Sequence, residues 1–431
     1  MKSPRCLSRR LLSGKPRNTA VIHSMPSLVP QGLGIFLCQQ GTGFLPGVQR
    51  RVESAPMQSS YFDHAATTPI RKVARDAWLD NAHLVNPASQ YGSGRAARSV
   101  LDTAREEIAE LLGCEPIEVL FTGSGTESDN IGVAGLWQAS SLRRIVSTGI
   151  EHPAVLETLK YLEARGANVD MLPIGTDGII SDLSALEEPA AVAAVMWANN
   201  ETGAIQPIHN VASSAAAAGT PLHVDAVQVV GHLPVNFHEL GATTLAASAH
   251  KFGGPRGVGV LLARRSPAPR PIFHGGGQER GIRSGTVDVA GAAATAAALS
   301  EAVAEMEQEQ RRVTALRNEL RSRILETIDN VVVHTPHDAL PGHLHMSFPG
   351  AEGDSLIMLL DSFGLEASTG SACSNGVNRA SHVLLAAGVE EKIARSTIRF
   401  TLGRTTEEAD VEKLVQQLPD VVRRARLAGM A

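Results

Sequence analysis

Short apolar runs alternate with helical segments between about residues 61 and 271 of this 431-residue chain. This alternation is typical of an α/β fold, in which helices cover both faces of a mostly parallel central sheet. In such sheets, ligands bind beyond the carboxyl ends of the strands. The predicted strands are residues 117–121, 145–147, 192–196, 222–224 and 257–262, and the clearest helices are residues 93–112 and 155–163.

The rest of the chain predicts a second, smaller unit. The Ala- and Glu-rich stretch 289–329 predicts one long helix that leads into it. We therefore expect a large domain over residues 59–290, then the linking helix and a small α+β C-terminal domain over residues 291–431. The expected strands of this domain are residues 331–334, 344–348 and 397–401, and its helices are residues 354–363 and 407–427.

The first 58 residues differ from the rest in composition. They hold eight basic residues and one acid, Glu53, whereas residues 59–431 hold 31 basic and 43 acidic residues. The segment is rich in Pro, Gly and Ser and has no periodic apolar face, which favours a disordered extension. It has the Arg- and Ser-rich character of an organelle transit peptide. Alternatively, the gene model is too long and Met57 is the true start, and this is the explanation we favour.

Composition also excludes several classes of protein. No stretch reaches the roughly 18 apolar residues of a membrane helix, and the acidic body argues against nucleic-acid binding. A chain of this length with only four cysteines is typical of a reducing compartment. We therefore expect a cytoplasmic protein that binds neither membranes nor nucleic acid. The cysteines are Cys6, Cys38, Cys114 and Cys373. Of these, we interpret Cys114 as structural.

One lysine stands in a segment that favours a covalently held cofactor. Lys251 follows Ser248 and His250, and a glycine-rich run, residues 252–259, comes directly after it. A lysine amine is a useful nucleophile when its pKa is lowered, and a Schiff base with pyridoxal 5'-phosphate (PLP) is the commonest such arrangement. The serine and histidine could bind phosphate, and the glycines would let the backbone approach the ring. The alternative is an ordinary loop with a Gly-Pro turn.

Two further segments supply what PLP requires. Residues 122–128, with Gly125 and Thr126 at their centre, expose backbone N–H groups at a predicted helix N-terminus, which favours an anion. Asp225 ends a short buried strand, and Gln228 follows three residues later. A carboxylate in that position would keep a pyridinium nitrogen protonated. The alternatives are a capped helix start for the first segment and a helix N-cap for Asp225.

Together these segments resemble the cysteine desulfurases, PLP-dependent class V aminotransferase-like enzymes of fold type I. The resemblance is to the IscS/NifS-like branch, which serves iron–sulfur cluster assembly and nitrogenase maturation, and it runs from about Tyr61 to the C-terminus. Several motifs stand in the family's order, which is more specific than any one of them. They are residues 61–69, 86–89, 126–130, 151–152, 199–203, 225–228, 248–251, 275–280, 283–286, 371–373 and 398–400.

The resemblance implies a role for each matched residue, and it assigns no metal ligand. Lys251 would hold PLP and move the α-proton of the substrate, while His152 would stack on the ring and assist proton transfer. A planar guanidinium, that of Arg399, would bind the substrate carboxylate. The other contacts would be Asp225 to the ring nitrogen, Asn200 and Gln228 to the hydroxyl side of the ring, Asn200 also to substrate, Gly125, Thr126, Ser248 and His250 to the phosphate, and Thr286 to the phosphate of a neighbouring subunit.

The resemblance also implies the reaction. Cys373, in the small glycine-flanked segment 369–376, would take sulfur from L-cysteine, giving L-alanine and a persulfide on its own side chain. The partners would be a second copy of the chain, in a homodimer with shared active sites, and a sulfur-acceptor protein such as an iron–sulfur scaffold; tRNA thiolation is a second destination. A selenocysteine lyase, another PLP-dependent lyase or aminotransferase, and a catalytically inactive scaffold are the alternatives.

The chain departs from the usual family pattern in two places. Many relatives have a histidine two residues after Ser89, where this chain has Tyr91. Residues 376–382 replace the Leu-Glu-Pro-Ser stretch that often follows the reactive cysteine. Because of Tyr91, we expect the packing on the substrate side of the site to differ from that in relatives. Because of residues 376–382, the sequence does not predict which protein accepts the sulfur.

Overall fold

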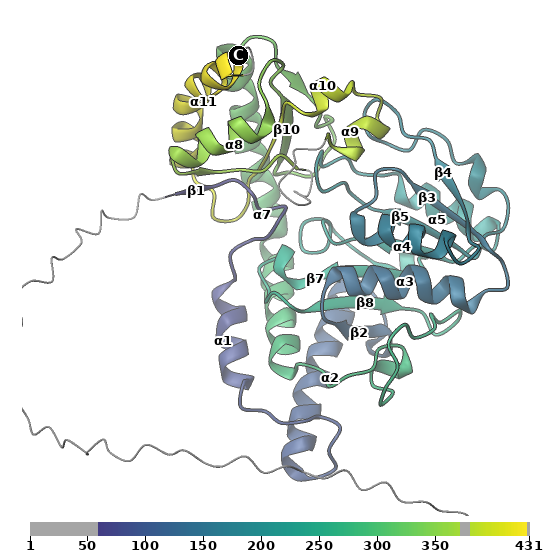
Figure 1. Ribbon diagram of the computed structural model, residues 1–431. Helices are drawn as coiled ribbons and strands as arrows, with labels where there is room; N and C mark the ends of the chain where they lie inside the picture. Colours follow the sequence, from purple (N-terminus) through teal and green to yellow (C-terminus); the bar gives the residue numbers. More distant parts are fainter. Residues whose placement is uncertain (1–58, 371–379, 429–431) are drawn as a thin grey trace, which may run out of the picture. The chain divides into compact units, whose positions relative to one another are not determined.

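The computed structural model describes residues 59–370 and 380–428. Its main element is a seven-stranded sheet in the order β2-β8-β7-β6-β5-β3-β4 (Figure 1). The neighbouring strands β4, β3, β5, β6 and β7 are parallel to one another, and β8 is antiparallel to both of its neighbours, β7 and β2. The bounds are β2 Val119–Thr122, β3 Arg144–Thr148, β4 Asn168–Leu172, β5 Val192–Met196, β6 Leu222–Asp225, β7 Thr244–Ser248 and β8 Gly259–Ala263.

Helices cover both faces of this sheet, as the sequence predicts. Alternate residues of a strand point to opposite faces, and in β5 Ala194 packs with Val133 and Leu159 of α3 and α4, whereas Val195 packs with Val211 of α5. Both faces are therefore buried, which explains why the strands are continuous apolar runs. The helices of this part are α1 Lys72–Asn81, α2 Gly92–Leu112, α3 Gly125–Ala139, α4 Pro153–Glu163, α5 Ile208–Ala217 and α6 Phe237–Leu240.

The predicted long helix is α7, Val289–Thr327. Its Ala-rich first half packs in the same hydrophobic cluster as α2, and Leu320 and Ile324 of its second half belong to a separate cluster. The helix thus joins the seven-stranded sheet to the C-terminal part of the chain (Figure 1). Within residues 59–370 and 380–428 there are also four short 3-10 turns: η1 Pro116–Glu118, η2 Ser184–Leu186, η3 Ala249–Lys251 and η4 Glu279–Gly281.

The C-terminal part contains a three-stranded antiparallel sheet in the order β12-β10-β9. The beginning of the described chain joins it, because β1 pairs with β11 and Phe62 packs against Phe400. Its strands and helices are β1 Ser60–Tyr61, β9 Val332–Val333, β10 His343–Ser347, β11 Leu365–Glu366, β12 Thr397–Thr401, α8 Gly353–Ser362, α9 His382–Ala386, α10 Glu391–Ala394 and α11 Glu408–Ala428.

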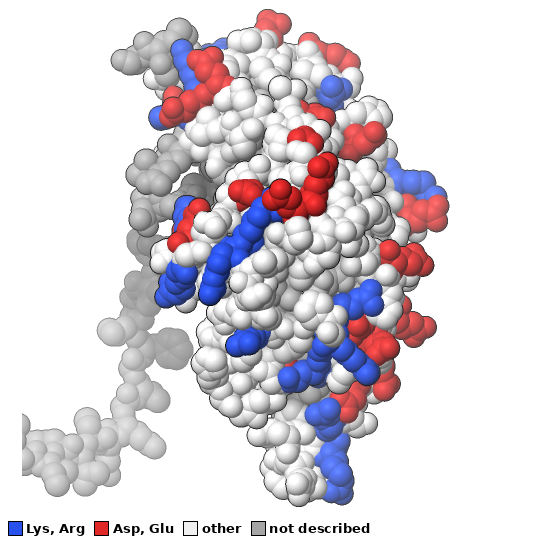
Figure 2. Space-filling view, turned by 90° about the vertical axis from the view of Figure 1, so that its right-hand side faces the viewer, with Lys and Arg blue, Asp and Glu red and all other residues white. Residues whose placement is uncertain are grey.

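The apolar content of the described helices and the charges on one face concern the expected absence of membrane and nucleic-acid binding. In residues 59–370 and 380–428, no helix combines the length and apolar composition needed to cross a bilayer. On the face in Figure 2, Lys and Arg side chains lie among Asp and Glu side chains, with uncharged areas between them. A mixture of charges on this face differs from the continuous basic surface that binds a phosphate backbone.

We expect Gly259→Ala to lower the free energy of unfolding by about 1–3 kcal/mol, because overpacking forces the backbone to move. A Cβ at Gly259, the first residue of β8, would lie 2.4 Å from the backbone carbonyl of Ser124. The control is Gly92→Ala at the start of α2, where the nearest atom is a flexible arginine tip at 3.9 Å. Urea denaturation of both variants measures the difference, and equal stability would contradict the close approach.

Candidate active site

A cavity of about 690 Å³ lies at the carboxyl ends of the parallel strands. It collects the predicted site residues that the structure describes, except Thr286, which is exposed in the segment before α7 and does not line the cavity. Cys373 lies outside the described residues. The predicted residues that line the cavity are Gly125, Thr126, His152, Asn200, Asp225, Gln228, Ser248, His250, Lys251 and Arg399.

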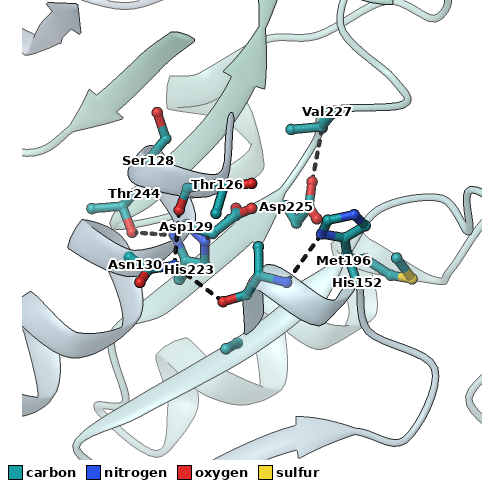
Figure 3. Close-up of polar contacts among 12 residues, drawn as sticks. Thr126, Ser128, Asp129, Asn130, His152, Met196, His223, Asp225, Val227 and Thr244 are labelled. Atoms are coloured by element: carbon teal, nitrogen blue, oxygen red, sulfur yellow. Dashed lines mark hydrogen bonds and ion pairs between the residues drawn. The ribbon is translucent and has the colours of Figure 1, made fainter. Parts of the chain in front are cut away.

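Asp225 and His152 lie beside each other at one wall of the cavity (Figure 3). Asp225 is the last residue of β6, and its Oδ1 accepts a hydrogen bond from the N–H of Val227 at 2.9 Å. His152 caps α4, and its Nδ1 accepts from the N–H of Ala154 at 3.1 Å. Burial lowers the pKa of His152 and raises the pKa of Asp225. The neutral imidazole therefore carries its hydrogen on Nε2.

Lys251 ends the 3-10 turn that follows β7. Its Nζ donates hydrogen bonds to the carbonyl oxygens of Ala65 at 2.5 Å and Ala66 at 3.0 Å. Burial, and then the positive charge of Arg399, lower the pKa of Lys251 to about 8. A much larger fraction of this amine is neutral near pH 7 than of an ordinary lysine, which makes it a better nucleophile and base.

The start of α3 forms an anion-binding corner beside Lys251. The N–H of Gly125 points to Ser248 Oγ at 3.4 Å, and a Cβ at Gly125 would lie 2.8 Å from Val227 Cγ2, so only glycine fits. Burial, more than the charge of Lys251, lowers the pKa of His250 to about 4, which leaves its ring neutral. Hydroxyls and free N–H groups at a helix N-terminus suit a phosphate.

Arg399 reaches the cavity from β12 and is almost fully buried. Its Nη2 pairs with Asp63 Oδ1 at 2.5 Å, and its Nη1 donates to the carbonyl oxygen of Asn200 at 2.8 Å. Among the described residues, its Nε has no partner. The guanidinium is thus oriented by two fixed contacts while one buried donor stays available to a ligand carboxylate. Asp63 belongs to the predicted motif 61–69, but no role was predicted for it.

Two more acids around the cavity wall were not predicted as site residues. Glu201 accepts a hydrogen bond from Ser381 Oγ at 2.5 Å. Asp129 lines the cavity, and its Oδ1 lies 3.2 Å from Nε2 of His223, whose Nδ1 contacts Thr244 (Figure 3). Both acids lie within the predicted motifs 126–130 and 199–203, but no role was predicted for them, because their burial depends on contacts between distant segments.

Glu151, next to His152, is the third unpredicted acid and is completely buried. Its Oε1 accepts from Thr148 Oγ1 at 2.7 Å and from the N–H of Met196 at 3.0 Å. Oε2 has no partner within the described part of the chain. Burial raises the pKa of Glu151 to about 8, so this carboxyl keeps its proton at neutral pH.

We expect the unmodified chain to lose folding stability as pH rises, and Glu151→Gln to abolish this pH-dependent loss. Between the unfolded pKa of Glu151, near 4.5, and its folded pKa of about 8, only the folded state holds the proton. The stability of the unmodified chain therefore falls as pH rises, by on the order of 1–3 kcal/mol from pH 5.5 to 7.5 relative to the variant. Denaturation at several pH values tests this, with the exposed Glu157→Gln as control. Parallel pH curves for Glu151→Gln and the unmodified chain would contradict an uncharged Glu151.

Two residues that flank the undescribed segment 371–379 also line the cavity. Gly370 precedes this segment and Ala380 follows it. His382, the first residue of α9, lines the cavity too, and its Nε2 contacts the carbonyl oxygen of Glu151 at 3.0 Å. The described residues on either side of segment 371–379, which contains Cys373, therefore lie at the site.

Comparison with known proteins assigns this fold and site to a family. The profile of the aminotransferase class-V family matches residues 60–414. The IscS-like cysteine desulfurase of Mycobacterium tuberculosis is 46% identical over 86% of this chain and 98% of its own length. The cysteine desulfurase IscS of Dictyoglomus turgidum is 39% identical over 85% of this chain and 95% of its own length.

A solved structure gives the same assignment. The structure titled NifS-like protein is 34% identical, covers 85% of this chain and 100% of its own, and superposes with a TM-score of 0.79. The predicted fold class, a mostly parallel sheet with helices on both faces and a smaller α+β part, is confirmed by the strand order and by this neighbour. The chain therefore belongs to the aminotransferase class-V family, within its group of IscS- and NifS-like cysteine desulfurases.

Proposed function

We propose that this protein is a PLP-dependent cysteine desulfurase that converts L-cysteine to L-alanine and leaves a persulfide on Cys373. The observation that carries the proposal is the convergence of Lys251, Asp225, His152 and Arg399 on one cavity beside the start of α3. An amine of lowered pKa, a carboxyl at a strand end and an anion-binding helix terminus form the set of groups that PLP chemistry needs. The printed names of the relatives support the same activity.

The described residues fit pyridoxal 5'-phosphate. Lys251 would bond its aldehyde carbon, Asp225 would hold the ring nitrogen, and His152 would stack on the ring. When bound, PLP supplies an electron sink that weakens the bonds at the α-carbon of the substrate. Gly125, Thr126, Ser248 and His250 would hold the phosphate, and Asn200 and Gln228 would contact the hydroxyl side of the ring.

The protein groups then divide the work of proton transfer and orientation. The Lys251 amine, with its pKa near 8, accepts the α-proton of the substrate. Arg399, held by Asp63 and by the carbonyl of Asn200, binds the substrate carboxylate. The neutral His152 has its hydrogen on Nε2, and this hydrogen is available to a base or a leaving group.

Cys373 completes the reaction as the sulfur acceptor. Its thiolate bonds to the substrate sulfur as the bond between that sulfur and the β-carbon breaks, and the electron pair of the broken bond stays on the substrate. The β-carbon takes a proton, the α-carbon regains the proton that Lys251 accepted, and L-alanine leaves. Cys373 follows Gly370, which lines the cavity, by three residues. Three residues of extended chain span at most about 10 Å, so the thiol cannot be farther than that from the cavity wall by much more than the length of its own side chain. The persulfide would then pass to a sulfur-acceptor protein such as an iron–sulfur scaffold.

We further propose a cytoplasmic homodimer. Apolar side chains are exposed on α1 and in the loop after it, including Trp78, Leu79 and Val85, with 41%, 60% and 43% of their surface accessible. A patch of this kind is typical of a protein–protein interface. Thr286 is also exposed, so it is free to contact the phosphate in a second subunit.

We expect the rate at which PLP attaches to the apoprotein to rise with pH through about 8, because the neutral amine of Lys251 is the nucleophile. An ordinary lysine would show the rise near 10.4. Appearance of the long-wavelength absorbance band measures this rate. Lys251→Ala should give no protein-bound band after removal of free PLP, whereas the exposed Lys72→Ala should behave like the unmodified protein. Attachment without Lys251 would refute the assignment.

We expect Cys373→Ala to lose sulfide release from L-cysteine by at least about 100-fold, because the nucleophile is absent, while the PLP absorbance remains. The control is Cys114→Ala, since burial raises the pKa of Cys114 to about 12 and keeps that thiol protonated. Sulfide and alanine assays with L-cysteine and L-selenocysteine are the measurement. Full alanine release by Cys373→Ala would favour a lyase of another kind, and turnover of selenocysteine alone would favour a selenocysteine lyase.

A further inference from the structure

The backbone of the Lys251 segment is held from the side opposite the α3 corner by two side chains. The carbonyl oxygen of Lys251 lies 3.0 Å from Nε2 of His232, and the carbonyl oxygen of Phe252 accepts from Nε of Arg71 at 3.0 Å. A carbonyl can only accept, so His232 has its hydrogen on Nε2. Burial lowers the pKa of His232, which keeps the ring neutral in this tautomer.

Both residues are themselves attached to α7, His232 through its backbone and Arg71 through its side chain. Nε2 of Gln310 donates to the carbonyl oxygen of His232 at 2.6 Å. Arg71 pairs with Glu301 at 2.8 Å and with Glu305 at 2.6 Å. Two relays therefore connect the long helix to consecutive carbonyl groups, those of Lys251 and Phe252 (helix α7 in Figure 1).

The loop that presents His232 also packs directly on this segment. A Cβ at Gly231 would lie 2.5 Å from Cβ of Phe252, and Gly231 has a φ of 82°, so the position requires glycine for both space and conformation. The same loop begins with Asp225 and contains Gln228. His232 thus ties the loop at the ring-nitrogen side of the site to the backbone of the lysine.

His232 and Lys251 line a small cavity of about 70 Å³. Lys251, Gln228 and Ala65 line both cavities, whereas His232 and Gln310 line only the small one. His232 consequently acts on the lysine through its backbone and has no access to a ligand in the larger cavity.

We propose that His232 is a positioning residue for Lys251. It connects the lysine to α7, because its backbone is hydrogen-bonded to Gln310 and its side chain is hydrogen-bonded to the backbone carbonyl of Lys251. The inference rests on the proposed function, because Lys251 matters as the group that bonds PLP and moves the α-proton. Loss of the donor leaves a carbonyl without its partner and lets the segment shift. Since Arg399 binds the substrate from a different strand, β12, the loss should act on catalysis more than on substrate binding.

The test compares His232→Ala with His232→Gln, whose amide can still donate to the carbonyl. The fully exposed His337→Ala is the matched control. Four quantities are measured: the rate of PLP attachment to the apoprotein by absorbance, kcat for L-cysteine, KM for L-cysteine, and the thermal midpoint. A hydrogen bond of ordinary strength corresponds to about a three- to tenfold change in rate.

We expect His232→Ala to attach PLP about three- to tenfold more slowly and to lose a similar factor in kcat, with KM changed less than about twofold. His232→Gln should stay within about twofold of the unmodified protein. The proposal is overturned if His232→Ala matches His337→Ala, or if His232→Gln is as slow as His232→Ala. A purely structural role would lower the thermal midpoint and leave both rates unchanged.

A second variant covers the case in which His232→Ala does not fold. Gln310→Ala removes the upstream donor and should slow PLP attachment about twofold or more, and an unchanged rate would refute the relay. If all variants attach PLP but the unmodified protein releases no sulfide from L-cysteine, the proposed function fails. The attachment rates would still decide the role of His232.

Discussion

The removal of water from the amine of Lys251 is the constraint on which the rest of the site depends. An ammonium group in this position loses hydration, and the neighbouring charge of Arg399 disfavours it further, while Asp225 and Asp63 oppose both effects. The balance leaves a lysine that is neutral much of the time near pH 8. A reactive amine of this kind is useful only in a fixed position, and the fold supplies that through β7 and the relays from α7.

The C-terminal sheet matters because it carries the cation that faces this lysine. Arg399 lies on β12, and the start of the described chain runs beside that strand, where the N–H of Thr401 donates to the carbonyl oxygen of Phe62 at 2.7 Å. The same contact places Asp63 against Arg399, although 336 residues separate them. Asp63 holds the guanidinium in place and partly neutralises it, which limits how far Arg399 lowers the pKa of Lys251.

Sequence alone predicts the long helix, the polar groups at the strand ends and five strands of the main sheet (β2, β3, β5, β6 and β8), because period, strand length and order along the chain are local signals, but it misses β4 and β7. It identifies Lys251 and Asp225 for the same reason. It does not find Glu151 as a protonated acid, or His232 as the partner of a backbone carbonyl. Those roles depend on burial and on hydrogen bonds between segments that only the tertiary structure brings together.

The buried acids around the site show how the fold directs charge. Burial raises the pKa of Asp129, Glu151 and Asp225, and the charge of Asp225 raises the pKa of each of the first two further. Of the three, Asp225 faces His152 and the positive charge of Lys251, and it also accepts the N–H of Val227. Three neighbouring carboxylates would repel one another strongly in a medium of low polarity. Of the three acids, Asp225 therefore has the contacts that most favour a carboxylate, and it lies at the strand end that lines the cavity, where the proposed function places the ring nitrogen of PLP.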